Sequence, residues 1–161
     1  MAFSLPTAAE LLGSRQRVLV TGGGGFIGGA VVRRLLRESK ATVFNLDKMG
    51  YASDLTSIKE VLAELGDGAE QRHVLQKLDL ANAAAVEQAV EQANPDLVMH
   101  LAAESHVDRS ISGPGVFIES NVTGTFNLLQ TVRSHYEGLS NERKEQFRLH
   151  HISTDEVFGS L

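Results

Sequence analysis

The chain has 161 residues, 42% hydrophobic and 22% charged, a composition that excludes intrinsic disorder, collagen-like repeats and a long coiled coil. No apolar run approaches the roughly 20 residues of a membrane span, and the start of the chain lacks the basic region of a secretory signal. Fifteen Lys and Arg against twenty Asp and Glu give a net charge of −5, which disfavours binding to nucleic acid or to an anionic membrane. There is no cysteine and no acid–histidine cluster with ligand spacing, so we expect no metal site and a cytoplasmic location.

Apolar, β-branched runs alternate with helical patterns along the chain. The sequence predicts strands at residues 17–21, 42–46, 73–80, 96–103 and 147–153, and the first, fourth and fifth are apolar enough to be covered on both faces. Helices are predicted at residues 26–38, 54–65 (with Asp54 as the N-cap), 83–93 and 115–135, followed by a polar connection at 140–145. Strands joined by helical crossovers predict an α/β fold with a doubly wound parallel sheet in the order 3-2-1-4-5.

A glycine-rich loop follows the first predicted strand and opens the first long helix. Gly22, Gly25 and Gly28 stand in the spacing G-x-x-G-x-x-G. Glycine permits the tight turn, lets backbone N–H groups approach a pyrophosphate and allows close helix–strand packing, while the helix dipole favours the anion. The alternative is a glycine-rich turn without a ligand. The strand, the helix and an acid downstream favour a dinucleotide site.

That acid is Asp47, which ends the second predicted strand, 19 residues after Gly28. A carboxylate there accepts hydrogen bonds from the adenosine ribose and repels a 2′-phosphate, which favours NAD over NADP. Lys48 beside it weakens this charge argument. Asp79 and Leu80, at the end of the third predicted strand, are candidates for holding the adenine.

Three further stretches resemble known enzymes. The glycine spacing together with residues 100–103 (HLAA) resembles the extended short-chain dehydrogenase/reductase superfamily. Residues 102–111 (AAESHVDRSI) and 151–159 (HISTDEVFG) resemble the dTDP-glucose 4,6-dehydratase family. Its Thr-Asp-Glu triplet, here residues 154–156, differs from the Thr-Ser-Glu of GDP-mannose dehydratases. The resemblance runs from residue 17 to residue 161.

The resemblance implies roles for individual residues. Phe26 and Ile27 would contact the pyrophosphate through their backbone, and Ser105 would touch both cofactor and substrate. The full set of cofactor positions that it implies, with the glycine loop included, is Gly22, Gly25, Phe26, Ile27, Gly28, Asp47, Lys48, Met49, Gly50, Asp79, Leu80, Leu101, Ala102, Ala103, Glu104, Ser105 and Ser120. The family often has threonine where this chain has Gly50, which removes one possible ribose contact.

The same resemblance gives the triplet its chemistry. Asp155 would act as the acid that protonates the departing C6 hydroxyl of the sugar, and Glu156 as the base that takes the C5 proton. Thr154 would hydrogen-bond the C4 oxygen. Like-charge coupling and desolvation can keep one of two neighbouring carboxyls protonated. Adjacent side chains of a strand point to opposite faces, so we expect the strand to end near Thr154.

Some parts of the family pattern do not occur in this sequence. The Tyr-x-x-x-Lys pair that takes the sugar hydroxyl proton is absent, because Tyr51 and Tyr136 are not followed by lysine four residues on. We therefore expect a leader at residues 1–16 and an incomplete NAD-binding Rossmann domain at 17–161, without the substrate domain and inactive alone. The resemblance also implies a homodimer that acts on dTDP-glucose. The alternatives are another NAD-dependent sugar epimerase, dehydratase or decarboxylase, or a stand-alone NAD-binding module.

Overall fold

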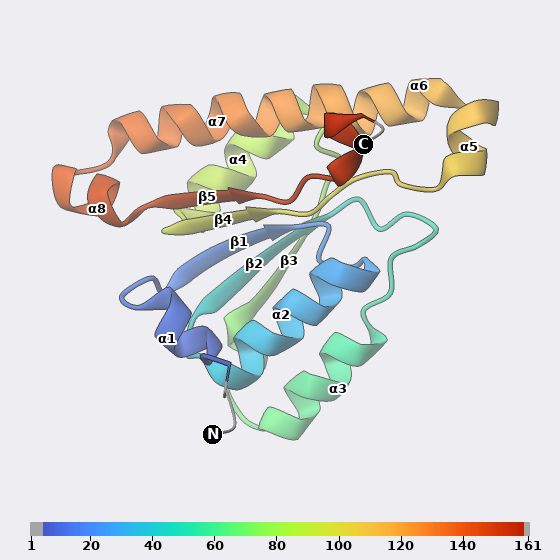
Figure 1. The fold of residues 1–161 in the computed structure, drawn as a ribbon. Coiled ribbons are helices and arrows are strands. Elements are labelled where there is room, and N and C mark those ends of the chain that lie inside the picture. Colours follow the sequence, from blue (N-terminus) through green and yellow to red (C-terminus); the bar gives the residue numbers. More distant parts are fainter. Residues whose placement is uncertain (1–4, 160–161) are drawn as a thin grey trace.

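The computed structural model describes residues 5–159, apart from the side chain of Glu156. Within this range the chain forms one parallel sheet in the order β3-β2-β1-β4-β5, which confirms the predicted topology (Figure 1). Its strands are β1 (Arg17–Thr21), β2 (Thr42–Asp47), β3 (His73–Lys77), β4 (Leu97–His100) and β5 (Arg148–His151). Because all the strands run in the same direction, their carboxyl ends lie along one edge of the sheet.

Helices cover both faces of this sheet (Figure 1). The α-helices are α1 (Ala8–Leu12), α2 (Phe26–Glu38), α3 (Thr56–Leu65), α4 (Ala83–Ala93), α5 (Val107–Ser112), α6 (Pro114–Phe117), α7 (Thr125–Gly138) and α8 (Asn141–Gln146). Successive side chains of a strand point to opposite faces, so β1 contributes to two cores. Val18 and Val20 pack with α1, α2 and α3, whereas Leu19 packs with α4 and α7. Among the described residues, no helix is long and apolar enough to cross a membrane.

The strand boundaries differ from the predicted ones mainly at the carboxyl ends. β2 is one residue longer than predicted, since Asp47 still pairs with Lys77, while β3, β4 and β5 end earlier. Leu80 lies beyond β3 and is nevertheless 7% exposed in the core beneath α4 and α7. Leu101, beyond β4, packs against the other core. The apolar pattern therefore identified residues that pack in the core, and some of these lie beyond the ends of the strands.

The prediction that the fifth strand is covered on both faces is wrong. All four residues of β5 are exposed, whereas β1 has four buried residues out of five. β5 lies at the edge of the sheet and pairs only with β4 among the described strands. An edge position leaves a strand with neighbours on one side only, whatever the hydropathy of its residues.

The short helices α1 and α8 were not predicted. α1 lies before the first strand, where Thr7 and Glu10 form a reciprocal capping box, and its residues Ala8 and Leu12 are buried against the core. α8 occupies most of the predicted polar connection at 140–145 and begins where the Ser140 hydroxyl accepts a hydrogen bond from the Arg143 amide. Both helices are too short for apolar periodicity to reveal them, and side-chain caps start each one.

The long helix predicted at residues 115–135 is present but is not uniform. Its first turn is α6, its middle is a π-helix (Ile118–Gly124) and its last part is α7, which extends to Gly138. At Gly124 the helix passes close to the loop after β3, since a Cβ there would lie 2.9 Å from the Leu80 Cβ. The preceding helix, α5, was not predicted.

The start of α3 also differs from the prediction. The N-cap position is Leu55 rather than Asp54, so that assignment is wrong by one residue. Asp54 instead accepts hydrogen bonds from the backbone and hydroxyl of Thr56, at 2.8 and 2.7 Å. These two bonds, the hydroxyl bond first, lower the pKa of the Asp54 carboxyl.

Candidate functional site

The candidate site lies where the glycine loop leaves the carboxyl end of β1. Gly22 has a φ of +72° and donates to the Leu46 carbonyl at 2.8 Å. A Cβ at Gly22 would lie 2.7 Å from the Ala102 Cα, so only glycine fits between the loop and the segment that leaves β4. The sequence identified this glycine but not the neighbour that requires it.

The loop packs equally closely at its other end. A Cβ at Gly28 would lie 2.1 Å from the Gly22 carbonyl oxygen, which explains the third glycine of the motif. Gly23 lies against the buried side chain of Asn45, and a Cβ on it would be 2.2 Å from the Asn45 Oδ1. These distances leave no room for side chains at these glycines. A ligand that binds to the loop would therefore contact its backbone.

The amino end of α2 has the properties of an anion site. Its N-cap, Gly25, offers no side-chain oxygen to the first-turn amides, and the first turn contains no acid. Phe26 and Ile27 begin the helix with side chains 94% and 61% exposed. A 13-residue helix with an uncapped, glycine-lined amino end fits the pyrophosphate of a dinucleotide, because the N–H groups and the helix dipole both favour negative charge.

Asp47 ends β2 next to this loop and is 6% exposed. Its Oδ2 accepts from the Gly24 amide at 2.8 Å, while Oδ1 accepts from the Met49 amide and the Ser53 hydroxyl, each at 2.7 Å. A carboxylate has about four lone-pair positions, so a ribose hydroxyl would take the last one or replace one of these donors. The predicted ribose acceptor therefore also ties the glycine loop to β2.

The residues after Asp47 form a tight turn. Met49 has a φ of +57°, a left-handed conformation that is uncommon outside glycine, and Gly50 follows it. The Lys48 Nζ lies 2.5 Å from the Glu104 Oε1. The resemblance implied that Lys48, Met49, Gly50 and Glu104 lie near the cofactor, but this ion pair was not predicted.

The segment leaving β4 carries the next group of predicted cofactor residues. Leu101, Ala102 and Glu104 are half-buried, whereas Ala103 and Ser105 are exposed. The side chain of Asn121 holds the backbone of Glu104 at both ends: its Oδ1 accepts from the Glu104 amide and its Nδ2 donates to the Glu104 carbonyl, each at 2.8 Å. Asn121 lies in the π-helix beside Ser120, which is half-buried, and was not singled out from the sequence.

The predicted adenine residues lie at the end of β3. Asp79 is exposed, and its Oδ1 accepts from the Ala81 amide at 2.9 Å. Leu80 is buried, and its carbonyl accepts from the side-chain Nδ2 of Asn127 in α7 at 2.9 Å. The loop that carries both residues is thus fixed to the helix above it.

A buried polar network beneath the site was missed. Thr21 Oγ1 accepts from the amides of Leu101 and Ala102, both at 3.2 Å, so its own proton goes to Nδ1 of His100 at 2.6 Å. The other ring nitrogen of His100 then carries the proton and donates to Thr125 Oγ1 at 2.9 Å. Burial, with a smaller effect of His151, lowers the pKa of His100 to about 4, so the ring is neutral at pH 7.

The triplet follows β5 on the same edge of the sheet. β5 ends at His151, and Asp155 opens a 3₁₀ helix (Asp155–Phe158), so the strand ends before the triplet as predicted. Thr154 and Asp155 are exposed, and the Thr154 hydroxyl lies 3.4 Å from the Asp155 Oδ1. The side chain of Glu156 lies outside the described residues. In Figure 1 this turn follows β5 and lies below the long helix, between the labels of α6 and α7.

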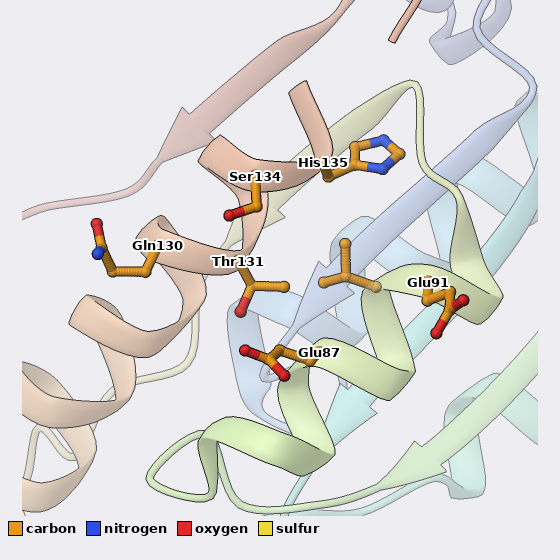
Figure 2. Close-up of a pocket in the computed structure, with 7 residues that line it drawn as sticks. Glu87, Glu91, Gln130, Thr131, Ser134 and His135 are labelled. Carbon is orange, nitrogen blue, oxygen red and sulfur yellow. The ribbon is translucent and has the colours of Figure 1, made fainter. Parts of the chain in front are cut away.

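A hollow of about 450 Å³ between α4 and α7 is not part of this site (Figure 2). Its lining includes Glu87 and Glu91 of α4 and Gln130 and His135 of α7. His135 donates to the carbonyl of Pro95, which precedes β4, at 3.0 Å. The hollow thus lies toward the amino ends of the strands. Among residues 5–159, apart from the Glu156 side chain, no group of three or more His, Cys, Asp or Glu side chains is arranged to hold a metal ion.

A parallel sheet in this order, with a glycine loop between β1 and α2, defines the Rossmann class of dinucleotide-binding domains. The family model described as GDP-mannose 4,6 dehydratase matches residues 19–161, and the chain belongs to that family. This result confirms the resemblance to extended short-chain dehydrogenases/reductases that the motifs indicated.

Several similar curated proteins are dTDP-glucose 4,6-dehydratases. The chain is 49% identical over 146 residues to that of Shigella flexneri and 48% identical to dTDP-glucose 4,6-dehydratase 1 of Escherichia coli K12. Both matches cover 91% of this chain and 39% of the relative. The chain therefore spans about two fifths of the length of these relatives.

Solved structures of similar enzymes share this fold. The chain is similar to DesIV, a dTDP-glucose 4,6-dehydratase from Streptomyces venezuelae with NAD bound, at 38% identity and a TM-score of 0.69, over 90% of this chain and 41% of that one. It is also similar to the Thermus thermophilus UDP-glucose 4-epimerase in complex with NAD, at 33% identity and a TM-score of 0.60, over 74% of this chain and 34% of that one. The fold is thus one that both dehydratases and epimerases use.

Proposed function

We propose that this chain is the NAD-binding part of a dTDP-glucose 4,6-dehydratase and carries the acid and the base of its elimination step. The observation that carries the proposal is the glycine loop. Its backbone is packed too closely for side chains at Gly22 and Gly28, it opens a helix whose first amides have no side-chain cap, and it lies beside a buried acid, Asp47. The similar dehydratase DesIV binds NAD, and the donor set here suits the same cofactor.

In this proposal the cofactor lies along the carboxyl edge of the sheet. The amides at the start of α2, among them those of Phe26 and Ile27, hold the pyrophosphate, and Asp47 accepts from the adenosine ribose. The loop of Asp79 and Leu80 holds the adenine. The segment from Leu101 to Ser105 follows the rest of the cofactor toward the triplet.

The triplet performs the elimination. NAD, when bound, supplies the acceptor and donor of a hydride at the sugar ring. The Thr154 hydroxyl donates a hydrogen bond to the C4 oxygen and holds the ring in place. Asp155 gives its proton to the departing C6 hydroxyl while Glu156 takes the C5 proton. The backbone at Asp155 is a 3₁₀ turn and not a strand, so the opposite-face alternation of strand side chains does not apply there.

The remaining expectations follow from the same proposal. Residues 17–161 form the nucleotide-binding domain, and residues from outside this range supply the proton acceptor for the C4 hydroxyl. A homodimer uses the exposed apolar side chains of the long helix, such as Val122 and Phe126, each more than half exposed. The partners are a nucleotide sugar and a second copy, not nucleic acid or a membrane, and the protein works in the cytoplasm.

A chimera tests this function. Residues 1–161 are joined to the part of Escherichia coli K12 dTDP-glucose 4,6-dehydratase 1 that lies beyond the matched region, and conversion of dTDP-glucose is measured. We expect NAD binding and a 4-keto-6-deoxy product. The variants Asp155→Asn and Glu156→Gln should still oxidise C4 and then stop, so reduced cofactor persists in a single turnover. A folded chimera that binds NAD without forming product, or variants that never reduce NAD, would contradict the proposal.

A further inference from the structure

Two loops flank the glycine loop, and contacts of two basic side chains join them. Lys48, in the loop after β2, pairs with Glu104 in the segment after β4, with Nζ 2.5 Å from Oε1. The Arg109 guanidinium of α5 lies over the ring of Tyr51, 3.8 Å from its centroid. These four side chains line one hollow of about 340 Å³. Two cations therefore face this hollow, next to the strand end that carries Asp47.

Lys48 stands at a position that decides between two cofactors. In Rossmann domains the acid at the end of the second strand accepts from the ribose hydroxyls of NAD, and a cation nearby accommodates the 2′-phosphate of NADP. Here the acid, Asp47, and the cation, Lys48, are adjacent in sequence. In the sequence alone, the charge of Asp47 therefore favours NAD, and the charge of Lys48 beside it opposes that preference.

In the structure the Lys48 ammonium already has a partner, the Glu104 carboxylate. The side chains of Lys48 and Glu104 are 34% and 10% exposed, so the carboxylate is largely removed from water while the ammonium stays partly exposed. Separating such a pair leaves a buried carboxylate without its partner, which is strongly unfavourable. Lys48 can turn toward a phosphate only by leaving Glu104.

Glu104 is also held in place. Both the N–H and the C=O of its backbone are bonded to the side-chain amide of Asn121, each at 2.8 Å. The carboxylate therefore extends from a fixed point of the main chain, which limits how far it can follow the ammonium if Lys48 moves. A fixed acceptor competes better with a ligand phosphate than a mobile one, because less conformational freedom is lost in forming its bond.

We propose that Glu104 is a specificity residue for the cofactor: it holds the Lys48 ammonium away from the 2′-phosphate of NADP, so that selection of NAD depends on Glu104 as well as on Asp47. The inference rests on the proposed NAD site and names a determinant within it. Exclusion of NADP then has two parts. Asp47 repels the phosphate, and Glu104 withholds a cation that would attract it.

The test measures dissociation constants for NAD and NADP by titration calorimetry on the 161-residue chain. Glu104→Gln keeps the size of the side chain and removes its charge, so Lys48 becomes available. We expect the ratio of NADP to NAD affinity to rise at least about tenfold, the effect of gaining one charge-assisted bond. Lys48→Gln alone should not raise the ratio, because it leaves the Glu104 charge without its partner and adds no cation for the phosphate, and Lys48→Gln with Glu104→Gln should cancel the gain.

Two further variants control the experiment. Glu87→Gln makes the same charge change on α4, in the hollow of Figure 2, and should leave the ratio at the original value. Glu104→Asp keeps the charge but shortens the side chain, and it gives an intermediate ratio even if Glu104→Gln does not fold.

Three outcomes overturn the inference while the unmodified chain still binds NAD. The ratio is unchanged in both Glu104 variants, it rises equally in Glu87→Gln, or the gain survives without Lys48. An unmodified chain that binds neither nucleotide overturns the proposed function, and the inference with it.

Discussion

At the scale of single residues, Asp47 has two roles, of which the sequence motif predicts only one. It is the proposed ribose acceptor, and it already accepts from Gly24, Met49 and Ser53. The second role fixes the shape of the loop on which the first depends. Loss of the carboxylate therefore affects both the ligand and the protein.

We expect Asp47→Ala to weaken NAD binding by about 1–3 kcal/mol, the range for losing a hydrogen bond to a charged group. The same variant should be less stable to urea, because the Gly24 amide loses its acceptor in a buried position. Asp67→Ala, which removes an exposed aspartate after α3, is the control for both measurements. If the two variants bind NAD equally well, Asp47 is not in the ribose site.

His100 provides a prediction about pH. Its pKa is about 4 in the folded chain against an ordinary value of 6.5, so unfolding lets the ring take up a proton that the fold rejects. The contribution to stability is complete above pH 6.5 and decreases as the pH falls toward 4, by on the order of 3 kcal/mol. Urea unfolding at a series of pH values measures it. His100→Gln should show a smaller decrease over the same interval, and an identical pH dependence in the two proteins would refute the assignment.

At the scale of elements, α2 offers a matched pair of glycines. A Cβ at Gly28 would meet the Gly22 carbonyl at 2.1 Å, whereas at Gly29 the nearest atom outside the helix backbone is the flexible end of Arg33, at 3.4 Å. Gly28→Ala should cost about 1–3 kcal/mol through overpacking and should weaken NAD binding. Gly29→Ala should be neutral or stabilise by up to about 1 kcal/mol, since alanine favours the helix. Thermal unfolding and calorimetry compare them, and equal effects would mean that the loop is not as tightly packed as described.

The elements also show what a sequence can predict. The positions of β1, α2 and α4 and the order of the strands follow from local periodicity and from the handedness of crossovers, and they are confirmed. The π-helix could not be predicted this way, because its hydrophobic pattern resembles that of an ordinary helix. What distinguishes the π-helix is Asn121. Its side-chain amide bonds to the backbone of Glu104, a contact that exists only in the folded chain.

The candidate site divides in the same way. The glycine loop and Asp47 were identifiable because each is marked by residue type and by a fixed place relative to a strand. The ion pair of Lys48 with Glu104 joins residues 56 positions apart, and the bond from Thr21 to His100 joins residues 79 apart. No spacing rule connects such residues, because they come close together only when the strands that carry or precede them pair in the sheet.

At the scale of the whole molecule, the exposed edge of the sheet has a consequence for the 161-residue chain. The four residues of β5 are exposed, and strand edges of this kind associate readily. We expect light scattering to show self-association that increases with concentration. Leu149→Lys on β5 should reduce it, whereas Leu11→Lys, at an exposed position of α1, should not. A monodisperse monomer at all concentrations would contradict this expectation.

The Thr21–His100 pair has a consequence for the variation of related sequences. One hydroxyl oxygen serves two amides and a ring nitrogen, and the ring in turn reaches Thr125. A change at position 21 leaves His100 without its donor, and a change at position 100 leaves the hydroxyl proton without an acceptor. The two positions, 79 residues apart, should therefore covary, with substitutions accepted together rather than one at a time.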